Sequence, residues 1–135
     1  YKYYMIDIIA AICLEQMKKL PEHLKFRRHV QSRYNAELNP MIERPPHSET
    51  VQYYVSRVPS EHRDSMIDYL ADKKIHTSVH FKPLYKYAPL TQDREYPVCE
   101  SEWVKLLTLP CHNRMVEEDI DYVIYWVNKY CEENI

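Results

Sequence analysis

The stretch that decides the fold is VQYYVSRVPSEHRDSMIDYLADKKIHTSVHF, residues 51–81. Residues 51–58 are rich in valine and tyrosine, which predicts a β-strand. Ser60 is a good N-cap for a helix over residues 61–73. Apolar and polar side chains then alternate along residues 75–81, a pattern typical of a half-buried strand. A strand, a helix and a strand within about 30 residues indicate the α/β or α+β class.

Two helical segments precede this unit. Residues 5–20 are apolar on nearly every side, and a helix of that kind is buried all round, against a partner or inside a larger protein. Pro21 is expected to break or restart the helix. Residues 22–38 carry one apolar stripe, Phe26, Val30, Tyr34 and Leu38, and basic side chains fill much of the remaining surface. That pattern predicts an amphipathic helix whose basic face is solvated.

Loops and helices follow on both sides of the central unit. The prolines in residues 39–50 and 83–97 predict loops there. Residues 98–107 are expected to include a short helix that carries Trp103. The last helix is the clearest, because Val116, Ile120, Val123, Val127 and Tyr130 repeat at helical spacing. Three acidic residues fill its first turn, where the helix dipole favours negative charge.

Composition excludes several functions. A chain of 135 residues is enough for one domain, and its net charge of −2 argues against a nucleic-acid or anionic-membrane surface. The longest apolar run falls far short of the ~20 residues that a membrane span needs. The chain contains no glycine, where roughly nine are usual for this length, which excludes Gly-rich phosphate loops. Four cysteines without a C-x-x-C pair favour structural thiols in a reducing cytoplasm, and Cys111 beside His112 is not a zinc spacing.

The histidines of residues 75–81 are the most suggestive polar residues. On a strand, His76 and His80 share a face but lie ~13 Å apart at ~3.3 Å per residue, too far to share one metal ion. That face either lines a cleft or is exposed to solvent. Spacing alone identifies no reaction and no catalytic residue in this chain.

Four motifs, in order, carry a resemblance to a known family. YKYYMIDIIAAICLEQM (1–17) resembles G-Y-[NK]-Y-R-M-x-[DN]-I-Q-A-A-I-G-L-x-Q-L, and residues 27–38 resemble R-R-x-x-x-x-x-Y-x-x-x-L. IHTSVHFKPL (75–84) resembles I-x-T-x-x-H-Y-x-P-L-H, and LPCH with its following acidic helix (109–120) resembles the family's closing segment. All four are similar to the nucleotide-sugar aminotransferases called the DegT/DnrJ/EryC1/StrS family.

The resemblance implies a pyridoxal-phosphate enzyme of aspartate-aminotransferase fold (fold type I), of which this chain matches only the C-terminal part. Residues 1–38 would be the helical connection from a large domain, and residues 39–135 the small domain. The implied α+β architecture has two N-terminal helices, a small mixed sheet and flanking helices. The implied partners are the missing N-terminal large domain, a second copy in a homodimer and a nucleotide-sugar substrate. The lysine that holds the cofactor lies upstream in the family, so the isolated chain is predicted not to transaminate.

The same resemblance implies three site residues. Lys2 stands where the family's Asn or Lys reaches across the dimer to the cofactor phosphate, and a lysine ammonium suits a phosphate. His80 matches the histidine near the sugar-nucleotide cleft, and Tyr85, in place of the motif's second histidine, is the other substrate-side candidate. The chain departs from the family at Tyr4, which replaces an arginine, and at Cys13, Lys74 and Ile9, which replace two glycines and a glutamine. Val116 stands where serine or threonine often caps the last helix, at a cost of about 1 kcal/mol.

The function implied is amino transfer, typically from glutamate, to a keto-sugar nucleotide, carried out by the longer parent protein. One alternative is a non-catalytic interaction or dimerisation module that kept the small-domain fold, and another is an α+β domain of unrelated function. Where a turn needs positive φ, a residue other than glycine costs about 1 kcal/mol or more. We therefore expect this domain to be less stable than one that has glycine at those turns.

Overall fold

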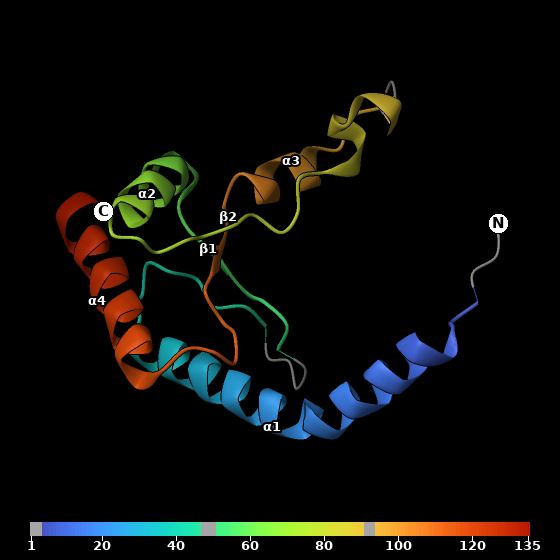
Figure 1. The fold of residues 1–135 in the computed structure, drawn as a ribbon. Coiled ribbons are helices and arrows are strands. Elements are labelled where there is room, and N and C mark those ends of the chain that lie inside the picture. The colour runs from blue at the N-terminus through green and yellow to red at the C-terminus, as the bar shows by residue number, and fades with distance from the viewer. Residues whose placement is uncertain (1–3, 47–50, 91–93) are drawn as a thin grey trace.

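The computed structural model describes residues 4–46, 51–90 and 94–135. Its elements are α1 (Asp7–Glu37), β1 (Tyr54–Arg57), α2 (Ser60–Asp72), η1 (Leu84–Lys86), η2 (Ala88–Leu90), α3 (Pro97–Trp103), β2 (Leu106–Leu109) and α4 (Glu117–Asn134). Figure 1 shows α2 and α4 close together at one end, the strands in the middle, and the first half of α1 extending away from the rest. No helix in these described ranges is long and apolar enough to cross a membrane.

The sheet is small and antiparallel, which corrects the expected mixed sheet. β1 pairs with β2 from Tyr54 opposite Leu109 to Arg57 opposite Leu106. Each strand is short, and their inward side chains reach the core. The fold class is nevertheless the α/β fragment that the sequence predicts.

The prediction of a strand over residues 75–81 is wrong. This segment runs extended beside β2 but pairs with it only at Ser78, through two backbone hydrogen bonds with Thr108 of 3.1 and 2.7 Å. Antiparallel pairing would next place His76 opposite Pro110, which has no backbone N–H to donate. The alternation itself holds at the start, since Ile75 is buried while His76 and Ser78 are exposed.

The two predicted N-terminal helices form one helix. α1 runs from Asp7 to Glu37 with Pro21 inside it. A proline removes one backbone hydrogen bond and bends a helix without always ending it, and α1 changes direction midway along its length (Figure 1). The second half of α1 buries the predicted stripe, with Val30 and Tyr34 fully enclosed and Leu38 3% exposed.

One core joins the second half of α1, both strands, α2 and α4. Its largest fully buried side chains include Tyr34, Tyr54, Ile42, Met66, Leu70, Leu107, Leu109 and Ile120. Residues on both sides of the predicted boundary at 38/39 contribute to this core, and the boundary itself stays a prediction.

Part of the basic face of α1 is bound to α4 and is not only solvated. Arg33 donates to Glu117 Oε2 (2.9 Å) and Asp121 Oδ1 (2.6 Å), and it also pairs with Glu37 on its own helix. His29 Nε2 lies 2.8 Å from Glu117 Oε1. Hydrogen bonding to Arg33 lowers the pKa of the Glu37 carboxyl. The acidic first turn of α4 therefore has a second role, because it holds α1 in place.

α4 keeps half of a capping box despite its valine N-cap. Val116 has no side-chain oxygen to cap the helix, but its own backbone N–H donates to Asp119 Oδ2 at 3.0 Å. Ser60, in contrast, is the first residue of α2 and not its cap, because Pro59 occupies that position.

Lys74 has positive φ, as expected for a residue that replaces a glycine. Its φ is 64°, in the turn that follows α2. A side chain with a Cβ pays a steric penalty in this left-handed conformation that glycine avoids. We expect Lys74→Gly to raise the free energy of unfolding by about 0.5–1 kcal/mol, measured by urea denaturation. Lys74→Ala is the control, since it removes the lysine side chain but keeps the Cβ. An equal gain from alanine would contradict the explanation.

Candidate functional site

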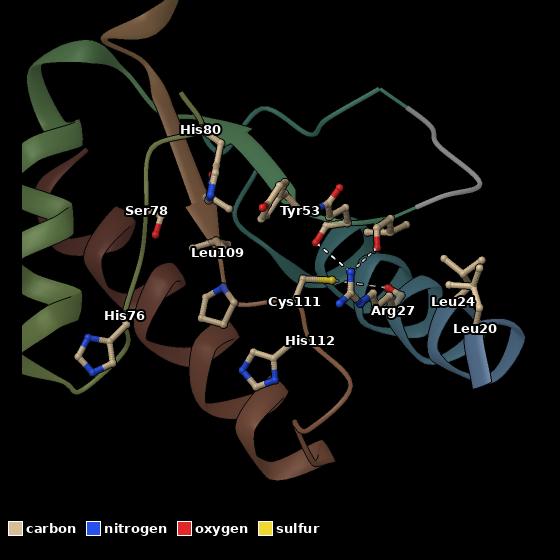
Figure 2. A pocket seen from close by; sticks show the side chains of 14 residues that line it. Leu20, Leu24, Arg27, Tyr53, His76, Ser78, His80, Leu109, Cys111 and His112 are labelled. Atoms are coloured by element: carbon tan, nitrogen blue, oxygen red, sulfur yellow. Dashed lines mark hydrogen bonds between the residues drawn. The ribbon is translucent and has the colours of Figure 1, made fainter. Parts of the chain in front are cut away.

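A cavity of about 560 Å³ lies between α1, β2 and the extended segment that carries His80. Its polar lining consists of Arg27, Gln52, Tyr53, His76, Ser78, His80, Thr108 and His112. Its apolar lining consists of Leu20, Leu24, Val51, Leu109, Pro110 and Cys111. Figure 2 shows these side chains arriving from separate parts of the chain, so the fold, and not one local motif, assembles the cavity.

Arg27 connects the α1 wall to the chain beside β1. One guanidinium nitrogen, Nη1, donates to the carbonyl oxygens of Val51 and Gln52, both at 3.3 Å (Figure 2). Its Nε is buried and has no hydrogen-bond partner within the described ranges. The guanidinium therefore brings a fixed positive charge to the cavity wall while it holds the segment before β1.

His80 is packed from two sides. Its ring stacks on Tyr53, with the ring centroids 4.0 Å apart and the planes at 21°. Its Nδ1 lies 2.9 Å from the hydroxyl oxygen of Thr108 on β2. Figure 2 shows the His80 ring beside Tyr53 at the cavity. Among the described residues, the other ring nitrogen, Nε2, has no hydrogen-bond partner.

Cys111 contributes a neutral wall. Its Sγ lies 3.8 Å from the carbonyl oxygen of Arg27, to which the thiol can donate. Burial raises the pKa of the Cys111 thiol to about 11, although the charge of Arg27 opposes that shift. A buried thiol in this state is a poor nucleophile at neutral pH.

The charge of the cavity selects for anions. Arg27 and three histidines line it, and none of the described lining residues is an aspartate or a glutamate. Guanidinium and imidazole N–H groups are good partners for phosphate and carboxylate oxygens. The arrangement can therefore bind a ligand that carries negative charge, and its apolar lining can cover the less polar part of that ligand.

The predicted site residues separate in space. His80 lines the cavity, whereas Tyr85 does not. Tyr85 lies in η1, where its hydroxyl donates to Glu100 Oε1 at 2.7 Å and its ring stacks on Tyr96 at a centroid distance of 4.5 Å. Partial burial, with this hydrogen bond, raises the pKa of the Tyr85 phenol. Lys2 lies outside the described residues.

Several cavity residues were not singled out from the sequence as site candidates. Arg27 and His112 lie in the family motifs at residues 27–38 and 109–120, so those motifs could have identified them. Tyr53 and Thr108 had none, because only folding places the residue before β1 and the strand β2 next to His80. Within the described ranges, no group of three or more His, Cys, Asp or Glu side chains could hold a metal ion.

Comparison with known proteins identifies the family. The sequence pattern of the DegT/DnrJ/EryC1/StrS aminotransferase family matches residues 1–128. The chain belongs to this family. The family is pyridoxal-phosphate dependent, and solved sugar aminotransferases similar to this chain include forms with pyridoxal phosphate and with pyridoxamine phosphate.

Similar proteins act on sugars and are much longer. The chain is 27% identical to dTDP-4-dehydro-2,3,6-trideoxy-D-glucose 4-aminotransferase of Saccharopolyspora spinosa, over 96% of this chain and 35% of that protein. It is 24% identical to GDP-perosamine synthase of Escherichia coli O157:H7, over 96% of this chain and 37% of that protein. The chain thus spans little more than a third of the length of these curated relatives.

Solved structures agree on the fold. The putative sugar aminotransferase Spr1654 of Streptococcus pneumoniae, in its pyridoxal-phosphate form, has a TM-score of 0.88 at 30% identity and covers the whole of this chain. The chain corresponds to 38% of that structure. The aminotransferase TlmJ of Streptoalloteichus hindustanus has a TM-score of 0.87 at 26% identity, over 94% of this chain and 37% of that one. The fold is therefore that of a part of a sugar aminotransferase.

Proposed function

We propose that this chain supplies the C-terminal small domain of a pyridoxal-phosphate-dependent aminotransferase that moves an amino group, typically from glutamate, onto a keto-sugar nucleotide. The observation that carries the proposal is the cavity. Arg27, His80 and His112 come from three family motifs that are far apart in the sequence, and all of them line it. A wall of cationic and neutral donors without described carboxylates suits the diphosphate of a sugar nucleotide.

The cofactor would be held mainly by the rest of the protein. Covalent attachment of pyridoxal phosphate needs a lysine amine, and none of the described residues that line the cavity is a lysine. The described residues of this cavity therefore do not fit the cofactor, and no chemical step is assigned to them. Contact of Lys2 with the cofactor phosphate across a dimer remains part of the proposal, as does substrate contact by Tyr85.

The exposed half of α1 supports a larger parent protein. Its apolar side chains lie on the surface of this chain, with Ile8 70% and Met17 65% exposed. Exposed apolar surface of this extent is typical of a face that another protein surface covers. We propose that the N-terminal large domain covers it, in a homodimer in which residues 1–38 connect the two domains.

The proposed compartment is the cytoplasm. Among the described residues all four cysteines are free thiols, and Cys13 and Cys99 are exposed. Exposed, unpaired thiols suit a reducing compartment.

A non-catalytic dimerisation module is the second candidate, because the exposed α1 surface would serve it equally well. The two candidates differ in what lies upstream. A catalytic parent needs a lysine in an S-x-x-x-x-K-like context encoded before Tyr1, whereas a module does not.

The isolated chain should not bind pyridoxal phosphate covalently, and the longer protein should. We expect titration of this chain with pyridoxal phosphate to give no saturable band in the visible spectrum. The protein expressed from the coding sequence that extends upstream of Tyr1 should give such a band and should transfer an amino group from glutamate to a keto-sugar nucleotide.

Two results would contradict the proposal. One is a longer reading frame with no candidate lysine, which favours the dimerisation module. The other is a saturable visible band from this chain alone. Replacing the upstream lysine with alanine in the longer protein is the matched control, since it should abolish the band and leave the fold intact.

A further inference from the structure

Backbone pairing brings Thr108 and His80 together. Ser78 and Thr108 exchange two backbone hydrogen bonds, of 3.1 and 2.7 Å. His80 follows Ser78 by two residues, in the turn that ends the extended segment, so this pairing brings its ring close to β2. Thr108 Oγ1 then lies 2.9 Å from His80 Nδ1. The backbone bridge between Ser78 and Thr108 therefore brings the two side chains within hydrogen-bonding distance.

The burial of the Thr108 hydroxyl favours a proton on one nitrogen of His80 over the other. Thr108 is 5% exposed, and among the described residues His80 Nδ1 is the only hydrogen-bond partner of its hydroxyl. A buried hydroxyl hydrogen without an acceptor costs about 1–3 kcal/mol. Donation of that hydrogen to Nδ1 avoids the cost, and a neutral imidazole whose Nδ1 accepts a hydrogen bond carries its proton on Nε2.

The stacked ring of Tyr53 restricts His80 further. Its centroid lies 4.0 Å from that of His80, and the ring of Phe81 lies perpendicular to the same imidazole at a centroid distance of 4.6 Å. A 180° flip of the imidazole would restore the stack on Tyr53 but would lose the hydrogen bond at Nδ1, so the contact with Thr108 favours one orientation of the ring. In that orientation Nδ1, and not Nε2, is bound to Thr108.

We propose that Thr108 is a positioning residue: it holds His80 as the Nε2–H tautomer, so that His80 donates a hydrogen bond to an anionic or hydroxyl oxygen of the sugar nucleotide. This rests on the proposed function, because that function supplies the ligand. A donor at this position fits a cavity whose described lining has no carboxylate. The roles are distinct, since His80 touches the ligand and Thr108 acts only through His80.

The tautomer can be tested on this chain without substrate. Long-range ¹H–¹⁵N correlation spectra of histidine-labelled chain, recorded at alkaline pH, show which imidazole nitrogen carries the proton. We expect Nε2–H for His80 in the unmodified chain and in Thr108→Ser, which keeps the hydroxyl. Thr108→Val removes the hydroxyl, and its two His80 nitrogen signals should move toward the values of a mixture of tautomers.

Two outcomes of the spectra overturn the proposal. The first is an Nδ1–H tautomer in the unmodified chain, which needs no variant and so does not depend on whether Thr108→Val folds. The second is a folded Thr108→Val chain whose His80 signals match those of the unmodified chain.

The consequence for binding is tested in the longer protein. Loss of one oriented hydrogen bond predicts a KM for the sugar nucleotide about three- to tenfold higher in Thr108→Val, with kcat less affected. Thr108→Ser should restore KM to nearly the unmodified value. Equal KM in the unmodified protein and in Thr108→Val would overturn the role of Thr108. A longer protein without amino-transfer activity would instead overturn the proposed function, and the tautomer spectra would still decide the role of Thr108.

Discussion

Tyr34→Ala should lower the free energy of unfolding by about 3–5 kcal/mol, a large part of the roughly 5–15 kcal/mol that a domain has. Tyr34 is fully buried. Its ring packs edge-on against Tyr54 at a centroid distance of 5.0 Å, and its hydroxyl donates to the carbonyl oxygen of Pro110 at 2.8 Å. Alanine would leave a cavity at the point where α1 meets the end of β2.

Tyr34→Phe separates the two contributions. It keeps the ring and removes only the hydroxyl, so it should cost about 1–2 kcal/mol through the unpaired carbonyl of Pro110. Urea denaturation of both variants, followed by the fluorescence of Trp103 and Trp126, measures the two losses. An equal loss in the two variants would show that packing of the ring is not the main contribution.

The contact between Tyr34 and Pro110 shows how much of the fold could be predicted from the sequence. The stripe that contains Tyr34 is visible in the sequence, because helical spacing marks the buried face of α1 correctly. The sequence does not show that Tyr34 meets Pro110, 76 residues later. Such contacts depend on the pairing of β1 with β2, which local patterns do not encode.

The errors at residues 75–81 and at Pro21 have different physical causes. Alternation along 75–81 reflects burial on one side, and it is correct about Ile75. It does not indicate a pairing partner, and Pro110 opposite His76 prevents the pairing from extending in that direction. Pro21 removes a single hydrogen bond, and the remaining bonds on both sides were enough to continue α1.

The candidate site was predictable only where a motif resembled the family. His80 was named in this way, and it lines the cavity. Tyr85 was named from the same motif, and it lies in η1 with its hydroxyl bound to Glu100, outside this cavity. Contact of either residue with substrate stays a prediction. Tyr53 and Thr108, which hold His80, lie outside the motif that names it, since tertiary structure alone brings them there.

Replacing Ile8 and Ile12 together with glutamate should convert this chain from a self-associating protein to a monomer. The two side chains are 70% and 54% exposed and lie one helical turn apart on the same face of α1. Each isoleucine gains about 1.5–3 kcal/mol when it is buried, so copies of the chain should associate through this surface. Two carboxylates there would remove the gain and add repulsion.

The stability of the fold should hardly change in this double variant. Neither isoleucine belongs to the core, and surface substitutions of this kind usually change the free energy of unfolding by about 0.5 kcal/mol or less. Sedimentation velocity and urea denaturation would measure the two properties separately. Lys19→Glu is the matched control, because it changes the net charge by the same −2 while it removes no apolar side chain, and association should persist in it.

The unmodified chain provides the decisive comparison. If it is already a cooperative monomer, the exposed half of α1 does not need a covering surface, and the argument for a large domain packed on it loses its support. If it associates and only the double variant becomes monomeric, the exposed isoleucines are the cause. In the longer protein, in contrast, the same two substitutions should reduce stability, because there the proposed large domain buries both side chains.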